Sequence, residues 1–465
     1  MTTTKNNEHK KLNFSSEREQ NQACLNSAEH EKNQGRKVLN VPNKREQNQT
    51  CLDSAEREGL RPKGNVPNLR FPEFQGEWEK TKFGDIATGF DYGMNAAAKN
   101  YDGVNKYIRI TDIDEASSTY TDKDIVSPDG VLTDNYLVNN RDILLARTGA
   151  STGKSYLYKK SDGKLYYAGF LIRANVTTHD PYFVFSQLHT HRYWRWVSIM
   201  SARSGQPGIN SQEYSSFPIY TTSIEEENKI AKLLSLLDER ISTQSKIIDK
   251  LQSLIKGLED NLLDNPLWEK TYLRSFMQFF STNSLSWEQL SYKEGAIRNL
   301  HYGLIHGFQT RGINSASLPM IKNEAIPKQY TLCQVGDVAF ADASEDTGEI
   351  AKSVEFVDTI EGDTICGLHT IHGRDIKNRT VVGFKGFAFN SRYFHNQIKR
   401  LAQGTKVFSI TANNLSSCYV YLPDLDTQTV IVRFLKSYEE QLIIDRMIFK
   451  QHEKQKQYLL RQMFI

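Results

Sequence analysis

The feature of this sequence that most limits its possible folds is a long internal repeat. Two strand-like runs are each followed by a Thr-Gly pair: Asp142–Ala146 with Thr152-Gly153, and Asp337–Ala341 with Thr347-Gly348. Both pairs are offset by 195 residues (337 − 142). Gly205 then pairs with Gly404 at an offset of 199 (404 − 205), which indicates small insertions in loops. We take Trp78-Glu79 and Trp287-Glu288 as the openings of the two copies.

Each copy ends in a segment with the apolar spacing of a long helix. Apolar residues alternate at steps of four and three, with only Gln244 polar in the series: Ile230, Leu234, Leu237, Ile241, Ile248, Leu251, Ile255, Leu258 and Leu262. This spacing predicts a coiled-coil seam between Ile224 and Leu263. Ser223 before three glutamates is the expected N-cap, and Asn265-Pro266 is the expected stop.

A seam on one helix requires a partner, and the second copy supplies one. The series Ile431, Leu435, Tyr438 and Leu442 follows the first at an offset of 201 (431 − 230). Because a globular domain separates the helices, we expect them to pair antiparallel with one domain at each end. Asp445, His452 and Lys456 occupy positions equivalent to apolar ones, so they are satisfied within the pair, by another subunit or by solvent.

The pattern predicts an α+β fold with two tandem globular domains joined by two long antiparallel coiled-coil helices in a pseudo-two-fold arrangement. We place the boundaries at 1–66 for a disordered, repeat-containing tail, 67–222 and 265–424 for the domains, and 223–264 and 425–465 for the helices. In the tail, Arg18–Glu29 returns as Arg45–Glu56, which is a neutral expansion or a docking element. Short strands are expected at Tyr107–Ile113, Asp142–Ala146, Tyr156–Lys159 and Phe217–Tyr220.

Composition limits the class of protein only broadly. A chain of 465 residues has room for two or three domains. It has no apolar run long enough to span a membrane and no signal-peptide core, so we expect a soluble, cytoplasmic protein. The net charge of +3 is too small to indicate a nucleic-acid partner. The five cysteines include no C-x-x-C pair, which predicts free thiols and neither a disulfide framework nor a zinc site.

Three segments give the chain a specific resemblance. Asn65–Trp78, the loop Asp142–Lys154 and the helix Glu226–Leu263 look like parts of the specificity subunit of type I restriction-modification systems. The resemblance covers about Asn65 to Ile465 and rests on both copies of the repeat. The tail before Asn65 departs from the family pattern, as do Asp342, Glu345 and Asp346, which stand where the first copy has Arg147, Ala150 and Ser151.

The resemblance implies a non-catalytic subunit with two target recognition domains that read a bipartite sequence in double-stranded DNA. It implies assembly with two methyltransferase subunits and with nuclease-translocase restriction subunits. S-adenosylmethionine, ATP and Mg would be used by those partners, so no cofactor is expected in this chain. A coiled-coil scaffold, or an inactive specificity subunit that does not read DNA, is the alternative.

Enzymatic functions are disfavoured by the motifs themselves. Gly149–Ser155 resembles a phosphate-binding loop, but it has three residues between its glycines where that motif has four, and a strand is expected after it. His179–Tyr182 and Asn265–Trp268 lack the second proline of a methyltransferase base clamp and are interpreted as a turn and a helix stop. Asp129 and Asp134 have no nearby Glu-x-Lys partner for metal-dependent nuclease chemistry.

Candidate DNA-contacting residues are polar or basic side chains in the predicted loops. In the first domain they are Arg109, Thr111, Arg147, Ser151, Thr152, Lys154, Arg203 and Gln206. In the second they are Lys322, Asn323, Gln403, Thr405 and Lys406. Asp342, Glu345 and Asp346 could accept hydrogen bonds from cytosine amino groups or face a partner subunit.

Overall fold

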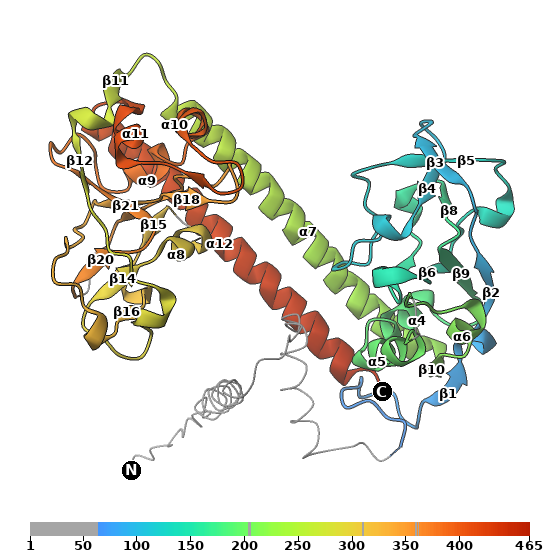
Figure 1. Ribbon diagram of the computed structural model, residues 1–465. Helices are drawn as coiled ribbons and strands as arrows, with labels where there is room; N and C mark the ends of the chain where they lie inside the picture. Colours follow the sequence, from blue (N-terminus) through green and yellow to red (C-terminus); the bar gives the residue numbers. More distant parts are fainter. Residues whose placement is uncertain (1–63, 203–205, 309–310, 359, 361) are drawn as a thin grey trace, which may run out of the picture.

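The computed structural model describes residues 64–202, 206–308, 311–358, 360 and 362–465. The predicted tail therefore lies almost wholly outside the described residues. Two globular domains stand at opposite ends of a pair of long helices, α7 (Ile224–Leu263) and α12 (Leu425–Gln462), as Figure 1 shows. At about 1.5 Å per residue, the 40 residues of α7 extend over roughly 60 Å.

Helix α7 begins and ends where its sequence predicts. The Ser223 hydroxyl accepts a hydrogen bond from the Glu226 amide, so Ser223 is the N-cap. Glu226 and Glu227 are buried, and each has a partner from the first domain: Arg70 donates to both oxygens of Glu226 at 2.7 Å, and His179 Nδ1 lies 2.8 Å from Glu227. The acidic first turn therefore fixes the helix to the domain as well as favouring the helix dipole.

The two helices pair antiparallel, because each end of one packs with the opposite end of the other. Ile230 and Leu234 near the start of α7 share a core with Leu460 near the end of α12. Leu263 at the end of α7 shares a second core with Ile431 and Leu435 at the start of α12. Each globular domain is thus anchored on both helices.

The polar seam positions are satisfied largely within the pair. Gln244 Nε2 donates to Asp445 Oδ1 at 2.7 Å, so the two polar residues of the opposing seams meet each other. Lys456 Nζ lies 2.6 Å from Asp238 Oδ1, also across the pair. His452 is half-buried. The poorer second seam is therefore matched to polar groups on α7.

Replacing Gln244 by Leu is expected to lower the free energy of unfolding by about 1–3 kcal/mol, because the buried Asp445 carboxylate loses one of its donors. Gln441 still donates to the other oxygen. Urea denaturation followed by circular dichroism measures the change. The double variant Gln244→Leu/Asp445→Leu should recover most of the loss, since no buried carboxylate then remains and Gln441, which loses its acceptor, is exposed. A single variant as stable as the wild type would contradict the argument.

The first domain is built on an antiparallel sheet whose strands lie in the order β2-β9-β6-β7. These strands are β2 (Ala87–Tyr92), β6 (Asp142–Ala146), β7 (Ser155–Leu157) and β9 (Leu171–Val176). Three two-stranded sheets are β1 (Glu79–Lys82) with β10 (Pro218–Thr221), β3 (Ala97–Asn100) with β5 (Val126–Asp129), and β4 (Lys106–Ile108) with β8 (Leu165–Tyr167). The helices are α3 (Phe83–Ile86), α4 (Pro181–Gln187), α5 (His191–Met200) and α6 (Ser211–Ser215).

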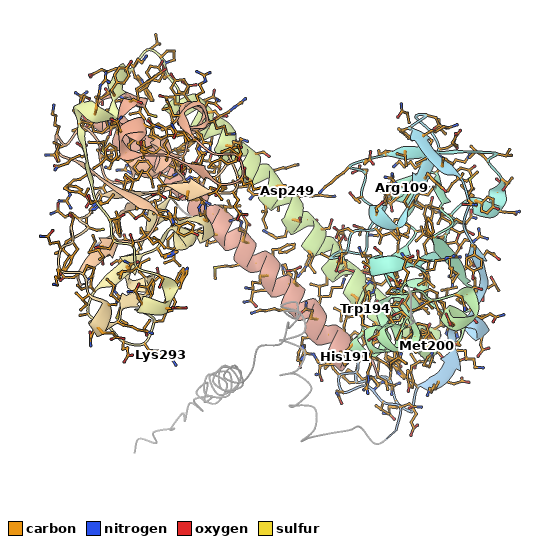
Figure 2. All side chains as sticks on the ribbon, in the orientation of Figure 1. Arg109, His191, Trp194, Met200, Asp249 and Lys293 are labelled. Carbon is orange, nitrogen blue, oxygen red and sulfur yellow. The ribbon has the colours of Figure 1, made fainter. Side chains whose placement is uncertain are left out.

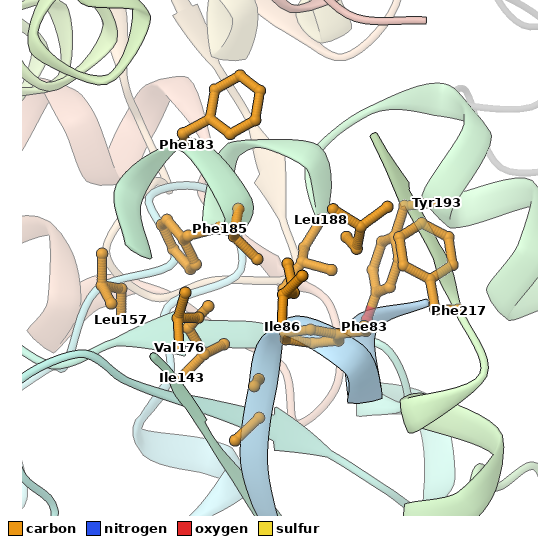
Figure 3. Close-up of a cluster of buried hydrophobic side chains, with 14 of the residues drawn as sticks. Phe83, Ile86, Ile143, Leu157, Val176, Phe183, Phe185, Leu188, Tyr193 and Phe217 are labelled. Atoms are coloured by element: carbon orange, nitrogen blue, oxygen red, sulfur yellow. The ribbon is translucent and has the colours of Figure 1, made fainter. Parts of the chain in front are cut away.

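Helix α4 covers this sheet and forms the domain core, which Figure 3 shows in close-up. Phe183 and Phe185 of α4 are buried in one cluster with Ile143 and Val176 of the sheet. The Asp180-Pro181 step, which was expected to be a turn, begins this helix: Asp180 Oδ1 accepts from the amides of Tyr182 and Phe183, and proline fits the first turn.

The second domain repeats this plan and adds a second substantial sheet. Its main sheet has the order β12-β21-β17-β19-β15, from β12 (Met277–Phe280), β15 (Gly312–Ile313), β17 (Val338–Ala341), β19 (Ser353–Phe356) and β21 (Thr370–Asp375). The other has the order β13-β16-β14-β20, from β13 (Leu290–Ser291), β14 (Arg298–Leu300), β16 (Met320–Ile321) and β20 (Thr364–Cys366). Two further pairs are β11 (Glu269–Tyr272) with β23 (Tyr419–Leu422), and β18 (Ala343–Ser344) with β22 (Phe408–Ser409). The helices are α8 (Tyr302–Gly307), α9 (Phe384–Ala388), α10 (Arg392–Leu401) and α11 (Ala412–Ser417).

The repeat is visible in hydrogen bonding as well as in topology. Strand β6 lies between β9 and β7, and β17 lies between β21 and β19 in the same way. At the start of each central strand a buried aspartate accepts a bond from the amide three residues earlier: Asp142 from Asn139 at 2.6 Å and Asp337 from Gln334 at 2.8 Å. The matching of the two copies at an offset of 195 is therefore confirmed at this strand.

The opening of the second copy, in contrast, was placed wrongly. Strand β1 follows Trp78 and pairs with β10, and β11 follows Trp268 and pairs with β23 in the equivalent way. The counterpart of Trp78 is therefore Trp268, at an offset of 190 (268 − 78), and not Trp287. A two-residue Trp-Glu match is too short to fix a register, whereas Trp-Glu-Lys-Thr occurs at both Trp78 and Trp268.

One predicted strand is also shorter than expected. Tyr107–Ile113 divides into β4, which ends at Ile108, and a 3-10 turn at Ile110–Asp112. The turn forms because the Asp112 carboxylate accepts a hydrogen bond from the Arg109 amide at 2.8 Å. That amide is then not available to pair with a neighbouring strand. Among the described residues, no helix is both long and apolar enough to cross a membrane.

Candidate DNA interface

The first domain brings two of its predicted loops together. Arg147–Lys154 follows β6 and contains the Gly-rich turn, while residues 206–209 precede α6. The Gly149 amide donates to the Pro207 carbonyl at 2.9 Å, and the Ile209 amide donates to the Arg147 carbonyl at 2.9 Å. We call Arg147–Lys154 and residues 206–209 the first loop pair. Its assembly unites Arg147, Ser151, Thr152, Lys154 and Gln206, whereas Arg203 lies outside the described residues.

Arg147 is presented on an aromatic side chain. Its guanidinium lies 4.7 Å from the centroid of the Tyr92 ring, and Tyr92 is exposed at the end of β2. Stacking on a ring holds the guanidinium plane while leaving its N–H groups free to donate. This is the geometry that bidentate contact with a guanine edge requires.

Thr152 and Gly153 hold the loop in place from inside. Thr152 is only 7% exposed, and its hydroxyl donates to the Gly149 carbonyl at 2.7 Å, so it stabilises the turn and does not face solvent. Gly153 has φ +92°, and a Cβ there would lie 2.7 Å from Val197 and 3.0 Å from Trp194. Its carbonyl accepts the Tyr193 hydroxyl at 2.8 Å. Only glycine fits this close approach to α5.

Lys154 is partly accessible to solvent. Lys154 is 18% exposed, and its Nζ lies 3.6 Å from Glu115 Oε2, on an exposed side chain. Ser151 is half-buried and Gln206 is exposed. The Lys154 ammonium can therefore exchange a solvent-screened carboxylate for a phosphate.

Replacing Lys154 by Ala is expected to weaken binding to all DNA sequences alike, and to reduce the slope of log affinity against log salt by about one. Titrations of the complete complex at several salt concentrations measure both effects. Lys160→Ala is the matched control, since Lys160 is an exposed lysine beyond the opposite end of β7. An unchanged salt slope in the Lys154 variant would remove its phosphate role.

Arg109 and Thr111 lie elsewhere in the first domain. Arg109 forms ion pairs with Asp112 at 2.8 Å and Asp124 at 3.0 Å, which hold its guanidinium in the 3-10 turn. Thr111 is exposed on the same turn. In Figure 2 Arg109 stands well apart from Trp194, the residue that contacts the first loop pair. The structure does not bring these two candidates into that loop pair.

The second domain contains the equivalent loop pair, made of residues 342–349 and 403–409, which we call the second loop pair. Strand β18 pairs with β22, and the Ile410 amide donates to the Asp342 carbonyl at 3.0 Å, as Ile209 does to Arg147. Gln403, Thr405 and Lys406 are exposed on this pair. Lys322 and Asn323 follow β16 in the other sheet, which Figure 1 shows away from β18.

The two loop pairs differ in charge. Asp342 takes the place of Arg147; burial raises its pKa, and His369 Nδ1 lies 3.1 Å from its carboxylate. Glu349 takes the place of Lys154, and Lys352 Nζ lies 3.0 Å from it. Glu345 and Asp346 are exposed. The second loop pair thus offers acceptors where the first offers donors.

Two aromatic residues at the first loop pair were missed from the sequence. Tyr92 supports Arg147, and Trp194 is 41% exposed beside Gly153, although its type is usual in cores. Exposed aromatic rings beside donors are typical of binding surfaces. No sequence signal marks them, because their contacts come from residues distant along the chain.

The prediction of free thiols is confirmed for the cysteines that the structure describes. Cys333, Cys366 and Cys418 are free thiols, as expected, and Cys24 and Cys51 lie outside the described residues. However, Cys333 and Cys366 are adjacent in space, with 3.6 Å between their sulfur atoms, and His372 completes a group that could hold a metal ion. The two cysteines are 33 residues apart in the sequence (366 − 333), so they form no short cysteine motif that would predict this contact.

Known proteins share both the sequence and the fold. The MjaVIII type I restriction enzyme specificity subunit of Methanocaldococcus jannaschii is 24% identical over 414 residues, which covers 84% of this chain and 92% of that protein. The putative MjaX specificity subunit of the same organism is 24% identical over 419 residues, covering 85% and 95%. The crystal structure of a type I S subunit from M. genitalium superposes with a TM-score of 0.54 at 13% identity, over 86% of this chain and 99% of that one.

A family model also matches directly. The type I restriction modification DNA specificity domain matches residues 75–253 and 367–450, which together make up more than half of the chain and include both long helices in large part. The chain therefore belongs to the type I restriction-modification DNA specificity family.

Proposed function

We propose that this chain recognises a bipartite DNA sequence through its two loop pairs and directs partner methyltransferase and restriction subunits to it. The observation that carries the proposal is the presence of two equivalent loop pairs on domains fixed at opposite ends of one antiparallel helix pair. The helix that joins the domains is roughly 60 Å long, which is a little under two turns of B-DNA. Two half-sites with an unread gap suit that geometry.

The difference in charge between the loop pairs supports two different half-sites. Arg147 and Gln206 offer donors for guanine or adenine edges, whereas exposed Glu345 and Asp346 offer acceptors for the amino group of cytosine. The chain itself is non-catalytic, and we propose that S-adenosylmethionine, ATP and Mg are bound by its partners. Because its target is DNA, we place its action in the cytoplasm.

The helix pair is the proposed docking surface for the partners. Apolar side chains remain exposed on its outer faces: Leu236, Ile247 and Leu254 on α7, and Val430, Phe434, Ile444 and Met447 on α12. Exposed apolar rows of this kind mark protein interfaces. Since the two helices are equivalent halves of the repeat, we propose two methyltransferase subunits, one for each half.

The proposal is tested by methylation-sensitive sequencing of DNA from cells that carry the cognate methyltransferase subunit with or without this chain. Modified adenines should appear only with the chain, at a motif split by a fixed gap. Arg147→Ala should relax one half-site alone, losing about 1–3 kcal/mol of discrimination there. If the chain forms a complex with the methyltransferase subunit but no motif is modified, the chain is an inactive specificity subunit or a coiled-coil scaffold.

A further inference from the structure

The second domain holds three metal-ligating side chains in one buried group. The sulfur atoms of Cys333 and Cys366 and a ring nitrogen of His372 all lie within 4.8 Å of one another. The two sulfur atoms are 3.6 Å apart, and all three residues are buried. Two thiols and an imidazole are the ligand types that zinc prefers in proteins.

The three residues come from both sheets of the second domain. Cys333 is held next to β20, because its amide donates to the Thr364 carbonyl at 2.8 Å, and Cys366 ends that strand. His372 lies in β21 of the main sheet, paired with Ala339 of β17. A bound ion would therefore join the two sheets beside the short connection that runs from Cys366 of β20 to Thr370 of β21.

One ring nitrogen of His372 is held by a carboxylate, as is common for metal-bound histidines. Its Nε2 lies 2.7 Å from Asp337 Oδ2, with both side chains buried, which leaves Nδ1 as the nitrogen for a metal. Asp337 is fixed in turn by Arg374, whose Nε donates to it at 2.8 Å. A ligating imidazole usually donates its other N–H to a carboxylate in this manner.

The distance between the two sulfur atoms agrees with both of them binding the same zinc ion. At a Zn–S distance of about 2.3 Å, tetrahedral geometry places two thiolates roughly 3.8 Å apart. A disulfide would need about 2.05 Å. We propose that Cys333, Cys366 and His372 bind one zinc ion, with a water molecule as the fourth ligand.

The first domain shows that this fold does not itself require these ligands. By strand register, the positions of Cys333, Cys366 and His372 correspond to Val138, Tyr167 and Arg173. There the Arg173 guanidinium lies 5.4 Å from the centre of the Tyr167 ring and makes an ordinary cation-π contact. The ligand set is thus a property of the second domain alone.

The site would stabilise the second loop pair. The turn between Cys366 and Thr370 carries His369, whose Nδ1 lies 3.1 Å from the carboxylate of Asp342 in that loop pair. An ion bound to Cys366 and His372 would hold the backbone on both sides of this turn, and so would restrict the position of His369. Loss of the ion should therefore loosen the second domain and leave the first unchanged.

Zinc content of the full chain tests the proposal. Cys24→Ser and Cys51→Ser remove the thiols of the tail, and the protein is purified under reducing conditions without chelators. Mass spectrometry should find about one zinc per chain. Cys333→Val, which copies Val138 of the first domain, should lose it, and the matched control Cys418→Ala, at another buried cysteine, should keep it.

Chelation supplies an arm that does not depend on the folding of any variant. Removing the ion from the Cys24→Ser/Cys51→Ser chain should lower the Tm. Adding zinc should raise the Tm again by several degrees, because an ion that binds only the folded protein stabilises it. A chain that is isolated without zinc and binds none on dialysis would overturn the proposal. So would a folded Cys333→Val variant that retains one zinc, or isolation with copper in its place.

Discussion

Replacing Lys385 by Met should destabilise the second domain by about 3–5 kcal/mol, the largest effect expected of any single change described here. Lys385 Nζ lies 2.9 Å from Glu355 Oε1, and the two side chains are only 2% and 0% exposed. Without its lysine, Glu355 would be a buried carboxylate with no cation beside it, held only by backbone amides such as that of Gly386, and burial already raises its pKa. The loss is measured by urea unfolding, followed by the fluorescence of the second domain's tryptophans, Trp268 and Trp287.

The first domain suggests the control. By strand register, Leu157 takes the place of Glu355 and packs in an apolar core. The double variant Glu355→Leu/Lys385→Met should therefore regain most of the lost stability, because apolar residues of similar size replace a buried pair with little cost. If Lys385→Met alone is as stable as the wild type, the ion pair does not hold α9 to β19.

Replacing Glu439 by Gln should make the protein more stable above neutral pH and should leave it unchanged in acid. Glu439 is part-buried on α12, where it accepts a hydrogen bond from the Arg311 amide. Burial raises the pKa of Glu439 to about 7; the positive charge of Arg311 opposes this rise, and Glu259 adds to it. Arg311 Nη2 also lies 3.6 Å from Glu259, so the charge of one guanidinium acts on two carboxylates.

The sign follows from linkage. The folded-state pKa of Glu439 lies above its ordinary value of 4.5, so the folded protein binds this proton more tightly than the unfolded chain does. The wild type should lose stability as the pH rises from about 4.5 to about 7, and change no further above that. Glu439→Gln removes this loss and should gain about 2 kcal/mol at pH 8, after allowance for its partial exposure.

Chemical denaturation at a series of pH values between 4.5 and 8 gives the comparison. Glu440→Gln is the matched control, because Glu440 is the next residue of the same helix and is exposed. Parallel stability profiles for wild type and Glu439→Gln would show that Glu439 ionises freely in the folded protein.

The long helices could be predicted from sequence because their signals are local. Ser223 as N-cap, the apolar seam of α7 and the stop before Pro266 are each decided by residues within a few turns of one another. The strand at Asp142–Ala146 was found for a similar reason, since its residues are buried on both sides and form an unbroken apolar run. The internal repeat then predicted the arrangement of domains, because each copy ends in one of the two helices.

The site could be predicted only in part because its contacts are distant in sequence. The Gly-rich loop was identified, but its partner is Pro207, and Arg147 rests on Tyr92. Thr152 was chosen for its polar side chain, yet the folded loop turns that hydroxyl inward. Cys333 and Cys366 lie next to each other because a β-bridge joins Leu332 and Ile365. No local sequence pattern predicts this bridge.

The packing of Met463 and Phe464 has a consequence for the exchange of one recognition domain for another. Met463 and Phe464 are buried in the core of the first domain, where the Phe464 ring lies 6.0 Å from Trp78 and 5.4 Å from Phe183. The Leu69 amide also donates to the Gln462 carbonyl. The first domain therefore includes Met463 and Phe464, which follow α12 and lie far from the rest of that domain in the sequence. A first domain exchanged for another must therefore bring in side chains that fit Phe464, and loss of Met463 and Phe464 would damage recognition by the first domain.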